Sequence, residues 1–415
     1  MKKKLLIIFL LALAVRIIWI STLDNTVDQW QEEGVKEAAC NIIQGKGYVM
    51  PRSVSSWQKG DQPFYSWREP GFTFFLVPVF FFFGENYLVA KLLLAILSSL
   101  VAVITYYLAK ETFGSEKVAL TSAFIIALLP EMVYWTGYLT PESFTIFMVL
   151  LPVFFLMKSI KMPTILNLFF SGVFLGLAAL TRAQIIVITP LLLASFVLVT
   201  GNRLKALKNA GLIFLFVFLT FSPWIMRSYR IHKQLVIMPT VAGEVFYIAN
   251  NPGTLKMIND PAGTFHGEDP ALFQNMSEVE ITRWYRKEAL RFIFSQPKDY
   301  VRLVANRFVR FWRLYPHLGV GVADHIYGRS HLWVSLLTSG ITILFFWMGA
   351  FISLKKWREG LLLLVLILSF SSLTILGRVA IRYRLPIMPY VIIFATYGFY
   401  SIRGCRRIKL SICQR

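Results

Sequence analysis

The chain has 415 residues, 56% of them hydrophobic and 16% charged, and a formal net charge of +21 at pH 7. Its mean hydropathy of +0.59 is far above that of a water-soluble domain, which excludes an ordinary soluble protein. Positive charge is also typical of nucleic-acid binding, but here it lies between apolar segments as membrane topology requires, so we expect no nucleic-acid partner. Three cysteines, Cys40, Cys405 and Cys413, are too few for a disulfide framework.

The apolar segments predict an all-α polytopic membrane protein. A transmembrane helix needs about 20 apolar residues, and about ten segments qualify when their boundaries are taken loosely. They are Lys4–Thr22, Tyr87–Lys110, Val118–Tyr134, Glu142–Lys158, Thr164–Leu180, Ala183–Thr200, Gly211–Met226, Leu332–Leu354, Gly360–Leu376 and Leu385–Tyr400. The first contains Arg16 and lacks an A-x-A-like cleavage site, so we expect an uncleaved helix rather than a signal peptide. A further run, Gly71–Gly84, is too short to span and indicates a re-entrant or interfacial element.

Basic residues alternate between successive loops, which predicts a cytoplasmic membrane protein with both termini cytoplasmic. The loops and termini on the predicted inner side contain Lys2–Lys4, Lys110, Lys117, Lys158, Lys161, Arg203, Lys205, Lys208, Lys355, Lys356, Arg358, Arg403, Arg406, Arg407, Lys409 and Arg415. Two long loops, about 23–86 and 227–331, would then face outward, within a single domain over residues 1–415. Two stretches of the second loop have the pattern of basic amphipathic helices lying on a membrane surface.

The first outer loop contains the most acidic stretch of the chain, Asp24–Tyr48. A helix over Asp28–Gln44 would place Asp28 and Glu32 on its apolar stripe, and Glu33 on the opposite face. A carboxylate on a buried stripe is costly unless it is used or paired. We therefore take Asp28 and Glu32 as the candidate catalytic acids, with Asp24 and Glu33 as secondary candidates. The alternative is a helix that starts later and leaves both acids in solvent.

Five arginines lie on the predicted outer side, where topology does not favour cations. They are Arg68, Arg182, Arg227, Arg382 and Arg384. Such a group indicates a site for a phosphate, with lipid headgroups or pairing with Glu69, Glu142 or Asp324 as the alternatives. Arg16 lies within a span and is expected to snorkel or to form a structural pair, with donor-phosphate binding as the other interpretation. Glu142 follows Pro141 at a helix start, which is ordinary capping chemistry, and is kept as a secondary site residue.

Common nucleotide and metal motifs are absent from the sequence. There is no P-loop, no G-x-G-x-x-G opening a helix after a strand, no H-E-x-x-H and no Cys/His cluster. No cofactor is therefore certain. A divalent metal ion could join acids and phosphate at the site, but no ligand set is visible in the sequence.

Several stretches, taken in order, resemble a known family. They are Gly45-Lys46-Gly47-Tyr48, Trp67-Arg68-Glu69-Pro70-Gly71-Phe72, Phe83-Gly84, Leu129-Pro130-Glu131, Leu139-Thr140-Pro141-Glu142, Gly176–Arg182, Pro223–Arg230, Ala249-Asn250-Asn251-Pro252 and Arg382–Ile387 with Pro389. Over nearly the whole chain they resemble the GT-C glycosyltransferases, in the branch of the protein O-mannosyltransferases and the lipid A aminoarabinose transferase. The family's acidic position falls on Gln31 by spacing, so the role would pass to Glu32 or Asp28, or activity would be lost.

The resemblance implies an all-α GT-C enzyme that takes a sugar from a polyprenyl phosphate at the outer membrane surface and inverts the anomeric centre. A first-loop carboxylate would activate the acceptor hydroxyl, and arginines would hold the departing phosphate. Membrane lipids are further partners, and the acceptor could be a protein, a lipid or a glycan. The alternative function is a lipid-linked-sugar flippase or transporter without chemistry, and a weaker one is a non-catalytic assembly subunit. Spans almost free of charge favour a surface reaction over transport.

Overall fold

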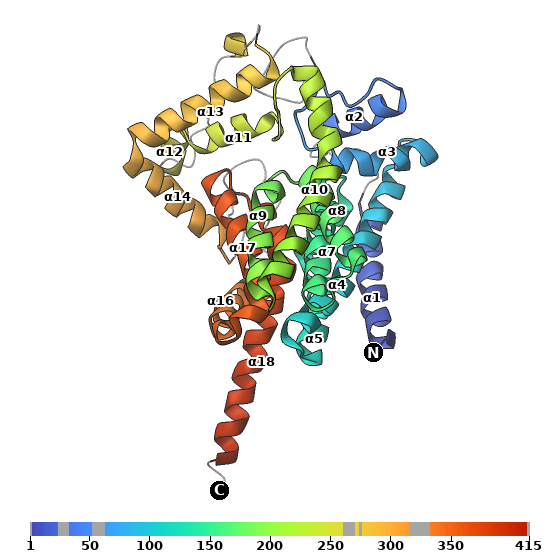
Figure 1. The fold of residues 1–415 in the computed structure, drawn as a ribbon, viewed down its shortest axis with the longest axis vertical. Coiled ribbons are helices and arrows are strands. Elements are labelled where there is room, and N and C mark those ends of the chain that lie inside the picture. The colour runs from blue at the N-terminus through green and yellow to red at the C-terminus, as the bar shows by residue number, and fades with distance from the viewer. Residues whose placement is uncertain are drawn as a thin grey trace.

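The computed structural model describes residues 2–23, 33–51, 63–259, 270–273, 276–314 and 333–412, and this part of the chain is helical, without a β-strand (Figure 1). Its α-helices are α1 (Lys2–Ser21), α2 (Glu33–Ile43), α3 (Gly71–Phe83), α4 (Tyr87–Phe113), α5 (Glu116–Leu128), α6 (Pro130–Tyr134), α7 (Pro141–Lys161), α8 (Ile165–Thr181), α9 (Gln184–Val199), α10 (Arg203–His232), α11 (Val241–Ala249), α12 (Pro252–Asn259), α13 (Glu278–Ser295), α14 (Pro297–Phe311), α16 (Ile341–Ser353), α17 (Trp357–Leu376) and α18 (Met388–Ile412). Shorter 3₁₀ or π turns are η2 (Trp135–Gly137), η3 (Pro270–Phe273), η4 (Leu336–Gly340), η5 (Leu354–Lys356) and η6 (Ile381–Ile387).

The helices confirm the predicted all-α multi-pass membrane protein. Among the described residues, six helices are long and apolar enough to cross a membrane, or seven if α5 and α6, bent by 50° at their junction, form one span. The predicted number of ten stays a prediction, because α8 and α9 have only 17 and 16 residues. In addition, Trp333–Leu376 counts as one candidate of 44 residues. A straight helix of that length would measure about 66 Å, twice the hydrocarbon thickness, and η5 interrupts it.

Figure 1 shows the apolar helices as a bundle, with α2, α11, α12 and α13 gathered at one end and the C-terminal half of α18 extending beyond the other. The predicted short element forms α3, which has 13 residues and contains Pro78. Its first residue, Gly71, lies so close to α8 that a Cβ there would be 2.4 Å from Thr181 Oγ1. The start of α3 is therefore held against the end of α8, whereas its depth in a membrane stays a prediction.

One buried carboxylate joins the two long loops. Glu278, the first residue of α13, accepts hydrogen bonds from the backbone N–H groups of Tyr65 (2.9 Å) and Ser66 (3.3 Å) and from Thr240 Oγ1 (2.7 Å). His232 Nε2, at the end of α10, lies 3.3 Å from the same carboxylate. A buried carboxylate needs several donors, and these come from both loops and from a candidate span. The end of the bundle that carries α2, α11 and α13 is thus tied to the bundle itself.

Arg16 is fully buried and stabilises the break between α5 and α6. Pro130 has no N–H, so the carbonyl of Ile126 loses its normal i+4 donor, and the extended backbone at Leu129 ends the ladder there. The Arg16 guanidinium donates to the carbonyl oxygens of Ala127 (2.8 Å) and Ile126 (3.4 Å) and to Ser98 Oγ (2.9 Å). The expectation of a structural partner for Arg16 is confirmed, and its partners are carbonyls and a hydroxyl.

Glycines allow the closest helix crossings in the bundle. In α16, a Cβ at Gly349 would lie 1.9 Å from the Phe394 carbonyl oxygen, and Gly398 of α18 faces the same spot. In α8, Gly172 and Gly176 are four residues apart. A Cβ at these positions would lie 2.5 Å and 2.6 Å, respectively, from the nearest atoms of α10. Small residues at this spacing let helix backbones approach each other in a membrane, where apolar burial alone gives little driving force.

Replacing Gly349 by Ala is expected to destabilise the protein by about 1–3 kcal/mol, because α16 and α18 must separate to admit the methyl group. Gly211→Ala is the matched control, since it lies in the interior of α10 and a Cβ there meets nothing within 4 Å. That control should be neutral or stabilise by up to about 1 kcal/mol through helix propensity. Thermal unfolding in detergent measures both, and a shift of the same sign in the two variants would contradict the crossing.

Candidate functional site

The predicted acids fall mostly outside the described part of the chain. Asp24, Asp28 and Glu32 lie in the segment 24–32, which the structure does not describe, so their roles stay predictions. Glu33 begins α2, and only its backbone is described. The apolar face predicted for this helix comprises Val35, Ala39, Ile42 and Ile43. It is partly confirmed, because Val35 and Ala39 are buried whereas Ile43 is exposed.

Arginines and glutamates that lie far apart in the sequence meet around η6. Arg382 Nε lies 3.4 Å from Glu142 Oε1 at the start of α7, and Arg384 Nη2 lies 3.9 Å from Glu131 Oε1 in α6. The arginine–glutamate cluster is formed by Glu131, Glu142, Arg182, Arg382, Tyr383 and Arg384. Pro130 and Pro141 each occupy the first turn of a helix, which puts the following glutamate at a helix N-terminus, where negative charge is favoured.

Tyr383 brings two of the predicted phosphate-binding arginines together. The guanidinium of Arg182, the residue that follows α8, lies 4.9 Å from the centre of the Tyr383 ring. The Arg382 guanidinium lies 5.5 Å from the same ring and 5.7 Å from that of Trp135. An aromatic face attracts a cation and restricts its movement. Two positive charges are therefore held on one tyrosine, which is a suitable arrangement for an anionic ligand.

Several polar oxygens near these arginines are buried without a hydrogen-bond partner among the described residues. They are Glu131 Oε2, Thr140 Oγ1, Glu142 Oε2, Ser143 Oγ and Gln184 Oε1. A buried polar group left unpaired costs about 1–3 kcal/mol, so each requires an explanation. The two glutamates each place one oxygen on an arginine and keep the other for a donor. Next to paired cations, such oxygens can accept hydrogen bonds from the hydroxyl groups of an anionic ligand.

Arg384 is deeper than its neighbour and is held by backbone. Its side chain is only 2% exposed, and Nη1 donates to the carbonyl oxygens of Phe311 (3.0 Å) and Arg313 (2.9 Å) at the end of α14. Its Nε has no partner among the described residues. Its Nη1 group therefore stabilises the end of a helix, and its predicted contact with phosphate stays a prediction.

The other two predicted arginines lie around Tyr48. Arg227 donates to the carbonyl oxygens of Tyr65 and Tyr48, and its guanidinium lies over the rings of Tyr48 and Trp224. The Tyr48 hydroxyl donates to the carbonyl oxygen of Arg68 (2.9 Å). Burial, followed by the charge of Glu69, raises the pKa of the Tyr48 phenol far above its usual value. The Tyr48 phenol is thus neutral, and the positive charge beside it is that of Arg227.

Glu69 links the two groups of arginines. Its Oε1 accepts a hydrogen bond from the Ala183 N–H (3.2 Å), next to Arg182, while its charge acts on Tyr48. The structure therefore brings Arg182, Arg382 and Arg384 into one cluster and Arg68 with Arg227 into a neighbouring one. Glu131 and Tyr383 were not among the predicted site residues. A signal for Glu131 was present, because Leu-Pro-Glu repeats the Pro-Glu pattern of Pro141 and Glu142.

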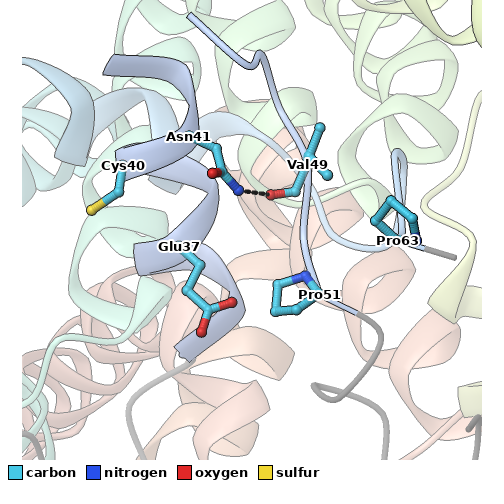
Figure 2. Close-up of a pocket in the computed structure, with 6 residues that line it drawn as sticks. All are labelled: Glu37, Cys40, Asn41, Val49, Pro51 and Pro63. Carbon is cyan, nitrogen blue, oxygen red and sulfur yellow. Dashed lines mark hydrogen bonds between the residues drawn. The ribbon is translucent and has the colours of Figure 1, made fainter. Parts of the chain in front are cut away.

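A separate open cavity of about 340 Å³ lies beside α2. It is lined by Glu37, Cys40 and Asn41 of α2 and by Val49, Pro51 and Pro63, and Figure 2 shows Asn41 pointing towards Val49. Asn41 Nδ2 donates to the Val49 carbonyl oxygen (2.9 Å), which holds the two sides together. The cavity shares no residue with the arginine–glutamate cluster. It is shallow and mostly apolar, and the cluster has the charged groups that phosphate chemistry needs, so we centre the candidate site on the cluster.

Cys40 at this cavity has a defined electrostatic environment. Its thiol donates to Glu85 Oε1 (3.3 Å), and Lys36 Nζ lies 2.8 Å from Glu85 Oε2. Burial, followed by the hydrogen bond to Glu85 and the charge of that carboxylate, raises the pKa of the Cys40 thiol, whereas the charge of Lys36 lowers it. The thiol is therefore mostly protonated near neutral pH and a poor nucleophile.

In a Cys405→Ser, Cys413→Ser background, we expect Cys40 to react with N-ethylmaleimide more slowly at pH 7.5 than a free thiol does. Glu85→Gln should accelerate the reaction, because it removes a charge that raises the thiol pKa, and Lys36→Met should slow it. The rate followed from pH 6 to 10 gives the pKa in each variant. Equal rates in Glu85→Gln and Lys36→Met would contradict this environment.

No group of three or more His, Cys, Asp or Glu side chains that could hold a metal ion is found among the described residues. Asp24, Asp28 and Glu32 lie outside that set, so the divalent metal considered from the sequence stays untested.

Comparison with known proteins explains the architecture. Residues 61–226, less than half of the chain, match the family described as dolichyl-phosphate-mannose-protein mannosyltransferase. The archaeal oligosaccharyltransferase AglB from Archaeoglobus fulgidus, in complex with an inhibitory peptide and a dolichol-phosphate, superposes with a TM-score of 0.59 at 14% identity over 99% of this chain and 51% of its own. The chain has the GT-C fold. The predicted GT-C-like fold is thereby confirmed.

The apo form of the Archaeoglobus fulgidus oligosaccharyltransferase matches the GT-C chain with the same TM-score at 15% identity, over 99% of this chain and 52% of that one. This GT-C chain thus spans about half the length of those two structures. ArnT from Cupriavidus metallidurans, bound to undecaprenyl phosphate, has a TM-score of 0.44 at 15% identity over 94% of this chain and 78% of its own. No curated protein sequence matches.

Proposed function

We propose that this GT-C protein transfers a sugar from a polyprenyl-phosphate donor to an acceptor at a membrane surface. The observation that carries the proposal is the arginine–glutamate cluster, in which cations are held beside buried carboxylate and hydroxyl oxygens that have no partner among the described residues. Two comparisons support the proposal. The AglB structure, which has the same fold, is a complex with dolichol-phosphate. The matched family is named for dolichyl-phosphate-mannose.

The proposal assigns the donor phosphate first to Arg182 and Arg382. Negative charge grows on the phosphate oxygens as the sugar leaves, and fixed guanidinium groups stabilise that charge without having to reorient. Arg68, Arg227 and Arg384 complete the proposed cationic surroundings, with Arg227 and Arg384 also holding backbone carbonyls. Glu142, paired with Arg382, would orient that arginine and offer its second oxygen to a sugar hydroxyl.

The proposed base is Asp28 or Glu32, with Asp24 and Glu33 as secondary candidates. Its carboxylate would take the proton of the acceptor hydroxyl while the acceptor oxygen forms a bond to the anomeric carbon. The bond from that carbon to the phosphate oxygen breaks, and the polyprenyl phosphate leaves with the electron pair. Attack opposite to the leaving group inverts the anomeric centre, as the family resemblance implies.

The proposal places the chain in the cytoplasmic membrane as one domain, with both termini inside and the cluster on the outer side. The alternation of basic loops in the sequence supports this orientation. The sugar is a hexose or a pentose, and the acceptor is a protein, a lipid or a glycan.

A transfer assay with purified protein tests the reaction. The donors are polyprenyl-phosphate sugars, the acceptors are a membrane-lipid pool and a peptide pool, and wild type is compared with Asp28→Asn and Glu32→Gln. We expect transfer by the wild type and a loss of at least about 100-fold in the variant that lacks the base. Turnover that survives both substitutions would remove these acids from the mechanism. Tight donor binding without turnover for any donor would favour the lipid-linked-sugar flippase instead.

Replacement of Arg382 by Gln is expected to lower kcat/KM for the donor by about 10²–10³-fold, because a fixed cation at the departing phosphate is lost. Arg358→Gln is the control, since this arginine lies at the start of α17, in a basic loop on the predicted inner side. Arg384→Gln should in addition lower the melting temperature, because the Phe311 and Arg313 carbonyls lose their donor. Unchanged donor kinetics in Arg382→Gln would remove it from the site.

A further inference from the structure

Helix α14 is apolar on two faces, and protein covers only one of them. Leu303 and Phe311 are fully buried on the covered face. On the other face Val301, Phe308 and Val309 are 65%, 48% and 63% exposed. At about 100° per residue these three side chains fall within a sector of about 100°, so they form one strip along the helix. A helix facing water would present polar residues there.

One edge of this apolar strip is basic. Arg302 borders it, Lys298 falls just inside the same border in the first turn, and Arg310 lies further round on that side. The 15 residues of α14 contain a single acidic side chain, Asp299, which lies between Arg302 and Arg310 around the helix. An apolar strip beside a row of cations matches a phospholipid surface, in which anionic phosphates lie above acyl chains. The charge pattern therefore favours an anionic lipid over another protein as the neighbour of this face.

The far end of α14 reaches a membrane-spanning segment. The ring of Trp312 stacks on Phe346 of α16, with centroids 5.3 Å apart, and lies 5.0 Å from the ring of Trp347. Both partners belong to the candidate span Trp333–Leu376, with Phe346 about 20 Å along it from Trp333. Figure 1 shows α14 running obliquely from α13 to the side of the bundle. Its exposed strip therefore continues towards the surface that lipid covers.

The preceding helix, α13, provides the contrast. From the sequence both helices resemble amphipathic helices on a membrane surface, but α13 packs its apolar face on α11 through Ile281, Tyr285 and Ala289. Its exposed positions are mostly charged, including Arg286 and Lys287, and the exposed apolar ones are Leu290 and Phe294 near its end. An exposed face that is mostly charged is typical of a helix in water, so an apolar strip along the length of the helix is found on α14, whereas on α13 exposed apolar residues are confined to its last two turns.

We propose that α14 is a lipid-docking helix at the membrane boundary. Its strip Val301, Phe308 and Val309 contacts acyl chains, and its basic edge, Lys298, Arg302 and Arg310, binds the phosphate groups of anionic phospholipids. This assignment concerns bulk lipid, does not use the arginine–glutamate cluster, and is independent of whether the protein transfers sugars.

The test uses full-length protein in which Cys40, Cys405 and Cys413 are replaced by Ser. A nitroxide is attached at Val301→Cys or Val309→Cys, and at Lys287→Cys on α13 as the matched control. The proteins are placed in nanodiscs of phosphatidylcholine alone or mixed with phosphatidylglycerol. Spin-label saturation then measures the accessibility of each site to oxygen, which concentrates in lipid, and to a water-soluble nickel chelate.

We expect sites 301 and 309 to be accessible to oxygen and several-fold less accessible to the nickel chelate than site 287. Phosphatidylglycerol should strengthen this protection. Arg302→Gln with Arg310→Gln should remove the added protection, and the two Lys substitutions, which keep the charge, should retain it. These Lys variants also separate loss of charge from loss of folding.

Three results would overturn the proposal. In the first, site 301 is as accessible to the nickel chelate as site 287 in both bilayers, so that α14 faces water. In the second, protection is the same with and without phosphatidylglycerol, so that the basic edge does not recognise the anionic headgroup. In the third, inorganic phosphate added to phosphatidylcholine nanodiscs reproduces the effect, so that the edge binds phosphate rather than lipid.

Discussion

Buried guanidinium groups hold the ends of helices inside this apolar bundle. A helix that ends away from water leaves carbonyl groups that must be paired within the protein. Arg16 pairs with carbonyls at the end of α5, Arg384 with those at the end of α14, and Arg307 with those of Ile375, Leu376 and Gly377 at the end of α17. Arginine suits this task because one planar group carries five donors and keeps its charge. Burial lowers the pKa of Arg307 only to about 10, so it stays protonated at neutral pH.

The same helix ends create the candidate site. Pro130 and Pro141 start helices at one level of the bundle and place Glu131 and Glu142 there, while η6 lies against α7 and carries three polar residues in succession. Because Arg384 is hydrogen-bonded to backbone carbonyls, the backbone of its neighbours Arg382 and Tyr383 is held in place. An arginine that holds a helix end, Arg384, and an arginine proposed to bind phosphate, Arg382, thus lie within a single short turn.

The sequence allowed the fold class, the helical segments and the GT-C resemblance to be predicted, because apolar runs of membrane length and Pro-Glu helix starts are local signals. The sequence does not predict that Arg384 is buried more deeply than Arg382, since the depth of each side chain depends on how η6 packs against α14. The sequence also predicts the same membrane-surface position for α13 and α14, because both helices have an apolar periodicity. Only tertiary contacts determine which face of each helix is covered by protein. The five arginines predicted to bind phosphate share a position on the outer side of the membrane. That position does not show that the Arg227 guanidinium is hydrogen-bonded to backbone carbonyls.

Arg307 has a consequence for protein engineering. The Nη2 of this single residue donates to Ala249 (2.6 Å) and Asn250 (2.8 Å) at the end of α11, while its Nη1 holds the end of α17. A chimaera that exchanges an outer loop on a constant bundle would cut through these contacts. A transplanted second loop would bring Arg307 together with Ala249 and Asn250, but it would place this arginine on a foreign α17 end, whose carbonyls it must still reach. The natural unit of exchange therefore includes α17 and η6 together with the segment from α11 to α14, and a crossover placed at the membrane surface would cut through it.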